Sequence, residues 1–144
     1  MVRKAEDSDL KTVASLARQL WPHHSLAEMK ADFRPVLEQD DAAVFLAFDG
    51  ETAVGFAQCG LRHDYVEGTD SSPVGYLEGI FVTEPFRRRG CARLLLTACE
   101  VWAKNQGCTE FASDCELDNR SSLDFHLKMG FQEANRIICF TKEL

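Results

Sequence analysis

The amino-acid sequence predicts an α/β (α+β) domain in which helices pack on a mixed sheet. Two observations predict it: apolar residues recur at helical spacing in some segments, and β-branched and aromatic residues form short runs in others. The two kinds of segment follow one another in the order β-α-α-β-β-β-α-β-α-β. The chain of 144 residues shows no repeat, low-complexity segment or linker, so we expect a single domain over residues 1–144.

The first half of the chain carries clear helix and turn signals. Pro22 ends the first helix, and Ser25 with Glu28 has the spacing of a capping box that starts the second. Pro35 is expected to bend or split that second helix, and Asp49-Gly50 is typical of a hairpin turn. Strands are predicted over residues 1–5, 42–48 and 52–61, and helices over residues 8–21 and 26–37.

The second half begins with a polar loop over residues 62–72. A loop of this length in a compact domain is usually functional or disordered. Gly107 and Gly130 are expected to end two helices. The predicted elements are a central strand over residues 73–83, a helix over 91–106, a strand over 108–113, a short helix over about 121–129 and a last strand over 136–142.

A basic loop, Arg87-Arg88-Arg89-Gly90, joins the central strand to the following helix. The first backbone N–H groups of a helix have no internal partner, and the helix dipole adds positive charge at that end. Gly90 allows a ligand to approach the main chain closely. The junction therefore predicts a site for phosphate groups, although three arginines in a row are also common on solvated surfaces.

Composition excludes several functions. The net charge of −7 argues against nucleic acid as a partner and favours a cationic substrate. No apolar run approaches the roughly 20 residues that cross a bilayer, and the N-terminus has no apolar signal region, so we expect no membrane partner and a cytoplasmic protein. The six cysteines lack the spacing of a metal site, which predicts reduced, mostly buried thiols and no bound metal.

Arg87-x-x-Gly90-x-Ala92 resembles the pyrophosphate loop of the GNAT acyltransferases, and the element order is similar to theirs over essentially the whole chain. The segments 63–74, 77–82 and 112–114, together with Leu20-Trp21-Pro22, also resemble those of the chromosomal aminoglycoside 6'-N-acetyltransferases. This resemblance implies a GNAT fold, with a mixed central sheet of about six to seven strands flanked by about four helices.

The resemblance implies acetyl-CoA as the donor and the 6'-amine of an aminoglycoside antibiotic as the acceptor, with direct attack and antibiotic resistance as the result. The pyrophosphate of the donor is expected on the N–H groups of the basic loop, and its pantetheine arm along the central strand. The residues expected to bind acetyl-CoA are Ile80, Phe81, Val82, Arg87, Arg88, Arg89, Gly90, Cys91, Ala92, Arg93 and Asn119.

Glu78 is the one ionisable carboxylic acid of the central strand, and the family places its catalytic base there. An aminoglycoside amine is largely protonated at neutral pH, so a base must remove a proton before attack. Apolar neighbours are expected to desolvate Glu78 and raise its pKa; a structural ion pair is the alternative. His126 occupies the position of a tyrosine that many GNAT enzymes use as general acid, and it is either that acid or a structural helix residue.

Recognition of a polycation takes several acidic groups around a pocket, and aromatic rings suit the apolar faces of sugars. Any single acidic residue is also common as solvated surface. The residues expected to bind the substrate are Trp21, Tyr65, Glu67, Asp70, Glu78 and Asp114.

Two alternatives stay open at this point. One is a GNAT acetyltransferase of another cationic amine, such as a polyamine or a protein amine, and the other is a non-catalytic acyl-CoA-binding sensor. A sensor has no need for Glu78 in the middle of an apolar strand. The resemblance also suggests a homodimer, in which the apolar segment over residues 137–140 pairs across the interface.

Overall fold

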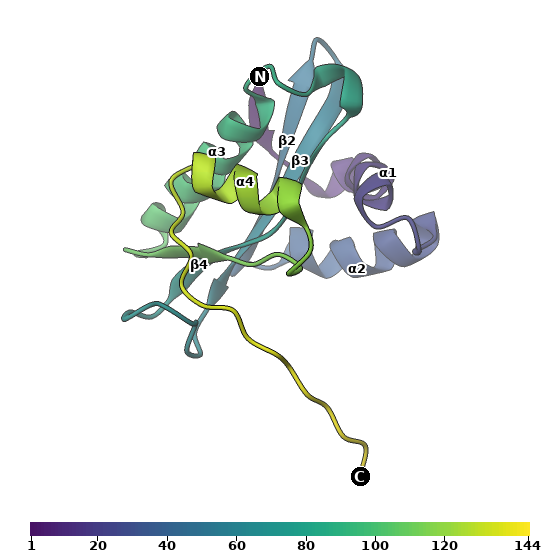
Figure 1. Ribbon diagram of the computed structural model, residues 1–144. Helices are drawn as coiled ribbons and strands as arrows, with labels where there is room; N and C mark the ends of the chain where they lie inside the picture. The colour runs from purple at the N-terminus through teal and green to yellow at the C-terminus, as the bar shows by residue number, and fades with distance from the viewer.

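The computed structural model describes all 144 residues. One sheet of five strands runs through the molecule, and helices cover both of its faces (Figure 1). The strands are β1 (Val2–Lys4), β2 (Ala42–Asp49), β3 (Thr52–Arg62), β4 (Val74–Val82) and β5 (Phe111–Ser113). The helices are α1 (Leu10–Leu20), α2 (Leu26–Glu38), α3 (Cys91–Asn105) and α4 (Arg120–Lys128), with short 3-10 turns η1 (Asp7–Asp9) and η2 (Glu84–Phe86).

The sheet is mixed, as the sequence predicts. Its strands lie in chain order, β1 to β5, so each strand pairs with the next one along the chain. The pairs from β1 to β4 are antiparallel, and β5 joins β4 in parallel after the crossover through α3. The domain therefore has the predicted class and element order up to α4.

Two apolar layers hold the helices against the sheet. On one face, α1 and α2 pack through Val13 and Phe33 onto Phe56 of β3. On the other face, α3 packs through Leu95 and Cys99 onto β2, β3 and β4. Because both faces are covered, the central strands are buried on both sides, which explains their nearly continuous apolar sequence.

Local signals place the helix ends well, with one exception. The Ser25 hydroxyl accepts the Glu28 amide, and the Glu28 carboxylate accepts the Ser25 amide, so the capping box is confirmed. Pro35 does not split α2, which continues to Glu38. The loss of one N–H is tolerated there because Met29 and Phe33 bury the helix against the sheet.

The predicted last strand over residues 136–142 is absent, and with it the predicted six to seven strands. Residues 131–144 contain neither helix nor strand, and this C-terminal tail runs away from the sheet as an extended chain (Figure 1). A strand needs a neighbour for its backbone groups, and residues 132–144 make no backbone–backbone hydrogen bond to any other part of the chain. The tail therefore has the composition of a strand, but the chain offers no neighbouring strand with which it could pair.

All six cysteines are free, but they are not mostly buried as expected. Three are buried, Cys59, Cys99 and Cys108, whereas Cys91 is half-buried and Cys115 and Cys139 are exposed. No helix combines the length and the apolar character that crossing a bilayer requires.

Candidate functional site

Strand β4 has one free edge, and the candidate site lies along it. Its pairing with β3 runs from Val74 to Val82, but its pairing with β5 covers only Gly75 to Leu77. From Glu78 onward the edge that faced β5 has no strand partner. Unpaired backbone N–H and C=O groups along an edge can bind an extended ligand as a further strand would be bound.

Glu78 stands at the point where the two strands separate, and a β-bulge sets its direction. Gly79 lies opposite Gln58 and Leu77 lies opposite Cys59, so no residue of β3 is paired with Glu78. A bulge of this kind re-aims the side chain of the extra residue. The sequence identified Glu78 by its charge, whereas the bulge that presents it left no sequence signal.

Trp21 lies against β4 beside Glu78. A Cβ atom added to Gly79 would approach the Trp21 ring to 2.7 Å, so only glycine allows the ring this close to the strand. Trp21 also lines a cavity of about 220 Å³, together with Met29 and Phe33. Three polar residues complete the lining: His24, Asp32 and Gln58.

All three polar lining residues, His24 included, were missed by sequence reasoning. Gln58 was detectable, because it is the only amide side chain in the apolar strand β3. Asp32 was not, because nothing in the sequence distinguishes it from other acidic residues on exposed helix faces. Its approach to Trp21 depends on how α2 packs against the sheet.

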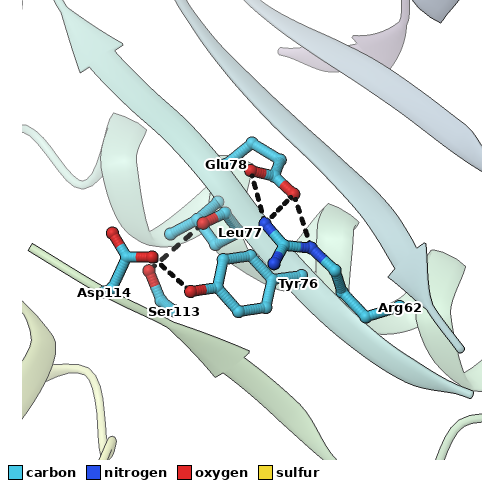
Figure 2. A network of polar contacts seen from close by, with 6 residues as sticks. All are labelled: Arg62, Tyr76, Leu77, Glu78, Ser113 and Asp114. Atoms are coloured by element: carbon cyan, nitrogen blue, oxygen red, sulfur yellow. Dashed lines mark hydrogen bonds and ion pairs between the residues drawn. The ribbon is translucent and has the colours of Figure 1, made fainter. Parts of the chain in front are cut away.

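Arg62 at the end of β3 forms an ion pair with Glu78 (Figure 2). Its Nε and Nη2 atoms lie 3.2 and 2.8 Å from Glu78 Oε1, and Nη2 is also 3.1 Å from Oε2. The Glu78 side chain is 32% exposed. The desolvated, apolar environment expected for Glu78 is therefore wrong, because the bulge turns the carboxylate toward solvent and toward Arg62.

Tyr76 links this ion pair to Asp114. The Arg62 guanidinium lies 3.8 Å from the centre of the Tyr76 ring, and the Tyr76 hydroxyl donates to the Asp114 carboxylate (Figure 2). Burial and the hydrogen bond to Asp114 raise the pKa of Tyr76 well above its usual value of 10.0, while the charge of Arg62 opposes the shift. The structure thus brings Glu78 and Asp114, both predicted as site residues, into one network with two partners that were not predicted for it.

His126 joins α4 to β5. Its Nδ1 atom lies 2.6 Å from the Ser122 carbonyl, so Nδ1 carries a hydrogen and donates it. The other ring nitrogen, Nε2, is 2.9 Å from the Ser113 hydroxyl, which in turn lies 3.2 Å from the Leu77 carbonyl. These contacts favour the structural alternative for His126, and its use as a general acid stays a prediction.

The loop over residues 63–73 carries the remaining predicted substrate residues but does not join them to the network. Tyr65 is 76% exposed. Glu67 accepts a hydrogen bond from the side chain of Asn135 at 3.0 Å. Asp70 is held through its backbone amide, which donates to Glu110 at 2.9 Å. Glu110 was not singled out from the sequence, because its spacing to the loop is unrelated to any motif.

The basic loop has the geometry expected of an anion site. Gly90 adopts φ +82°, which favours glycine, and α3 begins directly after it. The six consecutive backbone N–H groups from Arg88 to Arg93 make no hydrogen bond within the chain. Together with the dipole of α3, they form a set of donors suited to phosphate oxygens.

Not every predicted residue of this region has a free polar group. Arg87 donates through Nε to the Val82 carbonyl at 2.8 Å, which ties the loop to the end of β4. The Arg89 guanidinium lies 5.2 Å from the centre of the Phe86 ring. Asn119 caps α4 by accepting the Ser122 amide at 3.2 Å. A contact of Asn119 with acetyl-CoA stays a prediction.

Comparison with known proteins decides the family. The sequence model described as "Acetyltransferase (GNAT) family" matches residues 10–131. The chain belongs to the GNAT acetyltransferase family. It is 43% identical to aminoglycoside N(6')-acetyltransferase type 1 of Salmonella enteritidis, over 98% of this chain and 97% of that protein. It is 37% identical to the protein of the same name from Acinetobacter haemolyticus, over 99% and 98% of the two chains.

Solved structures agree with this assignment. Aminoglycoside acetyltransferase AAC(6')-Iy in complex with the bisubstrate analogue CoA-S-monomethyl-acetylneamine matches this GNAT chain with a TM-score of 0.95 and 42% identity, over 100% of this chain and 98% of that one. The 6'-N-acetyltransferase AAC(6')-IG from Acinetobacter haemolyticus matches with a TM-score of 0.95 and 38% identity, over 100% and 99%.

The site of this GNAT enzyme combines three chemical elements along one strand. The donors of residues 88–93 suit the phosphates of CoA, and the free edge of β4 suits an extended arm. The carboxylates of Glu78 and Asp114 suit a cationic acceptor. No group of three or more His, Cys, Asp or Glu side chains is arranged to hold a metal ion.

We expect Tyr76 to ionise at higher pH than an ordinary tyrosine. The chain has two tyrosines, so ultraviolet difference titration of the wild type and of Tyr76→Phe isolates its signal. The component lost in the variant should titrate above pH 10, because the folded state holds the phenol neutral. The stability that Tyr76 contributes is then complete below pH 10 and is lost as pH rises through the raised pKa. A lost component that titrates at or below pH 10 would contradict the partly buried hydrogen bond from Tyr76 to the Asp114 carboxylate.

Proposed function

We propose that this protein is an aminoglycoside 6'-N-acetyltransferase, which transfers acetyl from acetyl-CoA to the 6'-amine of aminoglycoside antibiotics and so confers resistance. One observation carries the proposal: the Glu78 carboxylate stands where β4 leaves β5, next to the free strand edge and on the strand that leads to the anion-binding loop. The names of relatives that span the whole chain support the same substrate class.

Acetyl-CoA is the donor substrate in this proposal. Its pyrophosphate accepts hydrogen bonds from the N–H groups between Arg88 and Ala92, at the positive end of α3. Its pantetheine arm lies along the edge of β4 beyond Leu77, where amide groups in it can replace the missing strand. This arrangement brings the thioester close to Glu78, where N–H groups on the free edge between Ile80 and Val82 can polarise its carbonyl.

Glu78 is the base in this proposal. The protonated 6'-amine binds at the carboxylates of Glu78 and Asp114, and Glu78 accepts the proton that must leave before nitrogen can attack. The amine then attacks the thioester carbonyl, the C–S bond breaks to release CoA as its thiolate, and the second proton lost by the nitrogen passes to that thiolate, so that a neutral amide and the CoA thiol are the products. A thiolate is a much better leaving group than an amine, so the reaction does not depend on a strong acid at His126. Trp21, Tyr65, Glu67 and Asp70 bind the remainder of the antibiotic.

We expect acetylation that depends on the 6'-amine. Thiol release from acetyl-CoA should occur with kanamycin or tobramycin, and it should be absent with an analogue that has a hydroxyl group at the 6' position. Turnover with spermidine alone would support a polyamine acetyltransferase. Tight binding of acetyl-CoA without any acetyl transfer would support the sensor alternative. Equal rates with the amine and the hydroxyl analogue would contradict the proposal.

We expect Glu78→Gln to lower kcat by about 100-fold or more, because the amide cannot accept the proton of the ammonium group. Steady-state kinetics with kanamycin measures the change. Glu51→Gln is the matched control, since Glu51 is exposed in the β2–β3 turn, seven residues before Gln58, the β3 residue beside the Glu78 bulge. Circular dichroism melting shows whether the fold of Glu78→Gln is intact. A normal kcat in a folded Glu78→Gln protein would exclude Glu78 as the base.

We also propose that the protein is a homodimer held together by its C-terminal tail. The tail leaves the body beside the loop over residues 63–73, where Asn135 donates to Glu67. It then presents Ile137, Ile138 and Phe140 at 68, 81 and 87% exposure. Apolar side chains so close together are rarely left in water, and the free backbone groups of the tail suit strand pairing. A second copy supplies a neighbour that the chain itself lacks.

The cytoplasmic location expected from the sequence stays a prediction.

We expect sedimentation velocity to give a dimer for the wild type at micromolar concentration. A protein with both Ile138→Asp and Phe140→Asp should sediment as a monomer, because two charges are placed in the apolar contact. Leu117→Asp is the control, since Leu117 is also strongly exposed, at 78%, but lies outside the tail. A monomeric wild type, or a double variant that remains dimeric, would contradict the role of the tail.

A further inference from the structure

Arg62 is a positive charge placed directly in front of the proposed base. Its guanidinium contacts both carboxylate oxygens of Glu78, and it lies 3.8 Å from the centre of the Tyr76 ring (Figure 2). In the proposed function the substrate ammonium group must reach Glu78, and Arg62 already contacts both oxygens of that carboxylate. Two cations competing for one carboxylate repel each other, so the ion pair and the bound ammonium group exclude one another.

We propose that Arg62 is a displaceable counter-ion of Glu78: its guanidinium holds the place of the substrate ammonium group and leaves Glu78 when the amine binds. The inference rests on the proposed function and names a positioning residue for the same site. In the substrate-free protein Arg62 fixes the orientation of the Glu78 side chain. In the complex the ammonium takes over those contacts and delivers its proton to the carboxylate.

The surroundings of Arg62 suit a guanidinium that moves. Its side chain is 45% exposed, so the displaced group can be hydrated at once. Its contact with Tyr76 does not involve Glu78, so the guanidinium keeps one attractive partner when the ion pair opens. Although burial opposes it, the hydrogen bond and charge of Glu78 raise the pKa of Arg62, so the competitor is always charged. Displacement therefore requires a positive charge on the ligand.

This competition separates substrate from product. When the ammonium form of the substrate binds, it takes the place of the Arg62 guanidinium beside Glu78. Asp114 supplies a second negative charge nearby. The acetylated product is a neutral amide at the same position, so it cannot replace Arg62. Once Glu78 has lost its proton to solvent, the guanidinium returns and restores the ion pair. Arg62 thus competes with the amine for Glu78 but does not compete with the product.

The test is the affinity of the enzyme–CoA complex for kanamycin, measured by isothermal titration calorimetry. Arg62→Met keeps an unbranched side chain against Tyr76 but removes the competing charge. We expect it to bind kanamycin about 5-fold more tightly, because a half-exposed ion pair no longer has to be opened. In steady-state kinetics the KM for kanamycin should fall, and the KM for acetyl-CoA should not change. Affinity for 6'-N-acetylkanamycin should be unaltered. Arg62→Lys, which keeps the charge but not the two-point contact, should fall between wild type and Arg62→Met.

Two comparisons make the result specific. Arg3→Met is the matched control, because Arg3 forms a two-point ion pair with Asp9, stacks on Phe48 and is 41% exposed, yet lies outside the site. It should leave kanamycin affinity unchanged. In a Glu78→Gln background the gain from Arg62→Met should shrink markedly, because the pair no longer exists. If a folded Arg62→Met protein binds kanamycin with unchanged or weaker affinity, the inference is overturned. The proposed function then still stands, provided that the wild type turns over its substrate. Absence of wild-type turnover overturns both.

Discussion

The site depends on the unequal pairing of β4. Between Gly75 and Leu77 this strand is held from both sides, and beyond Leu77 it is held by β3 alone. The first stretch fixes the strand rigidly in the sheet, and the second leaves one row of backbone groups available to a ligand. Short β5 is the cause, because a longer strand would close the edge. The unpaired edge of β4 beyond Leu77 is therefore what allows a long, flexible donor to bind along the strand.

The charges of the chain are separated along the same strand. The chain as a whole is acidic, with a net charge of −7, yet the loop after β4 carries consecutive arginines and six free N–H groups. Glu78 and Asp114 stand at the earlier part of the strand. Opposite potentials at these two positions allow an anionic substrate to bind at the end of β4 and a cationic substrate to bind at its earlier part. Arg87 keeps this arrangement intact, because its bond to the Val82 carbonyl ties the loop to the strand.

Local sequence signals predicted most of the fold and several of the residues that the structure places along β4, whose roles stay predictions. The capping box of α2, the Asp49-Gly50 turn and the glycine before α3 are properties of a few neighbouring residues, and all were predicted correctly. The C-terminal tail was predicted as a strand from the same kind of evidence and is not one. Strand propensity describes a segment, whereas a strand also requires a neighbour, and no short-range pattern reports whether that neighbour lies in the same chain.

The Arg62–Glu78 pair was beyond prediction for a related reason. Sixteen residues separate the two, and their contact depends on the register of β3 and β4 and on the bulge that turns Glu78 outward. The expectation of a desolvated base assumed that sequence neighbours on a strand are also spatial neighbours, although they alternate between its faces. A base activated by burial would be poised before substrate arrives. A base paired with an arginine is instead held in an ion pair beside solvent. Its exposure to the reacting amine then depends on the charge of the substrate, so recognition of the ammonium group and release of the base become the same event.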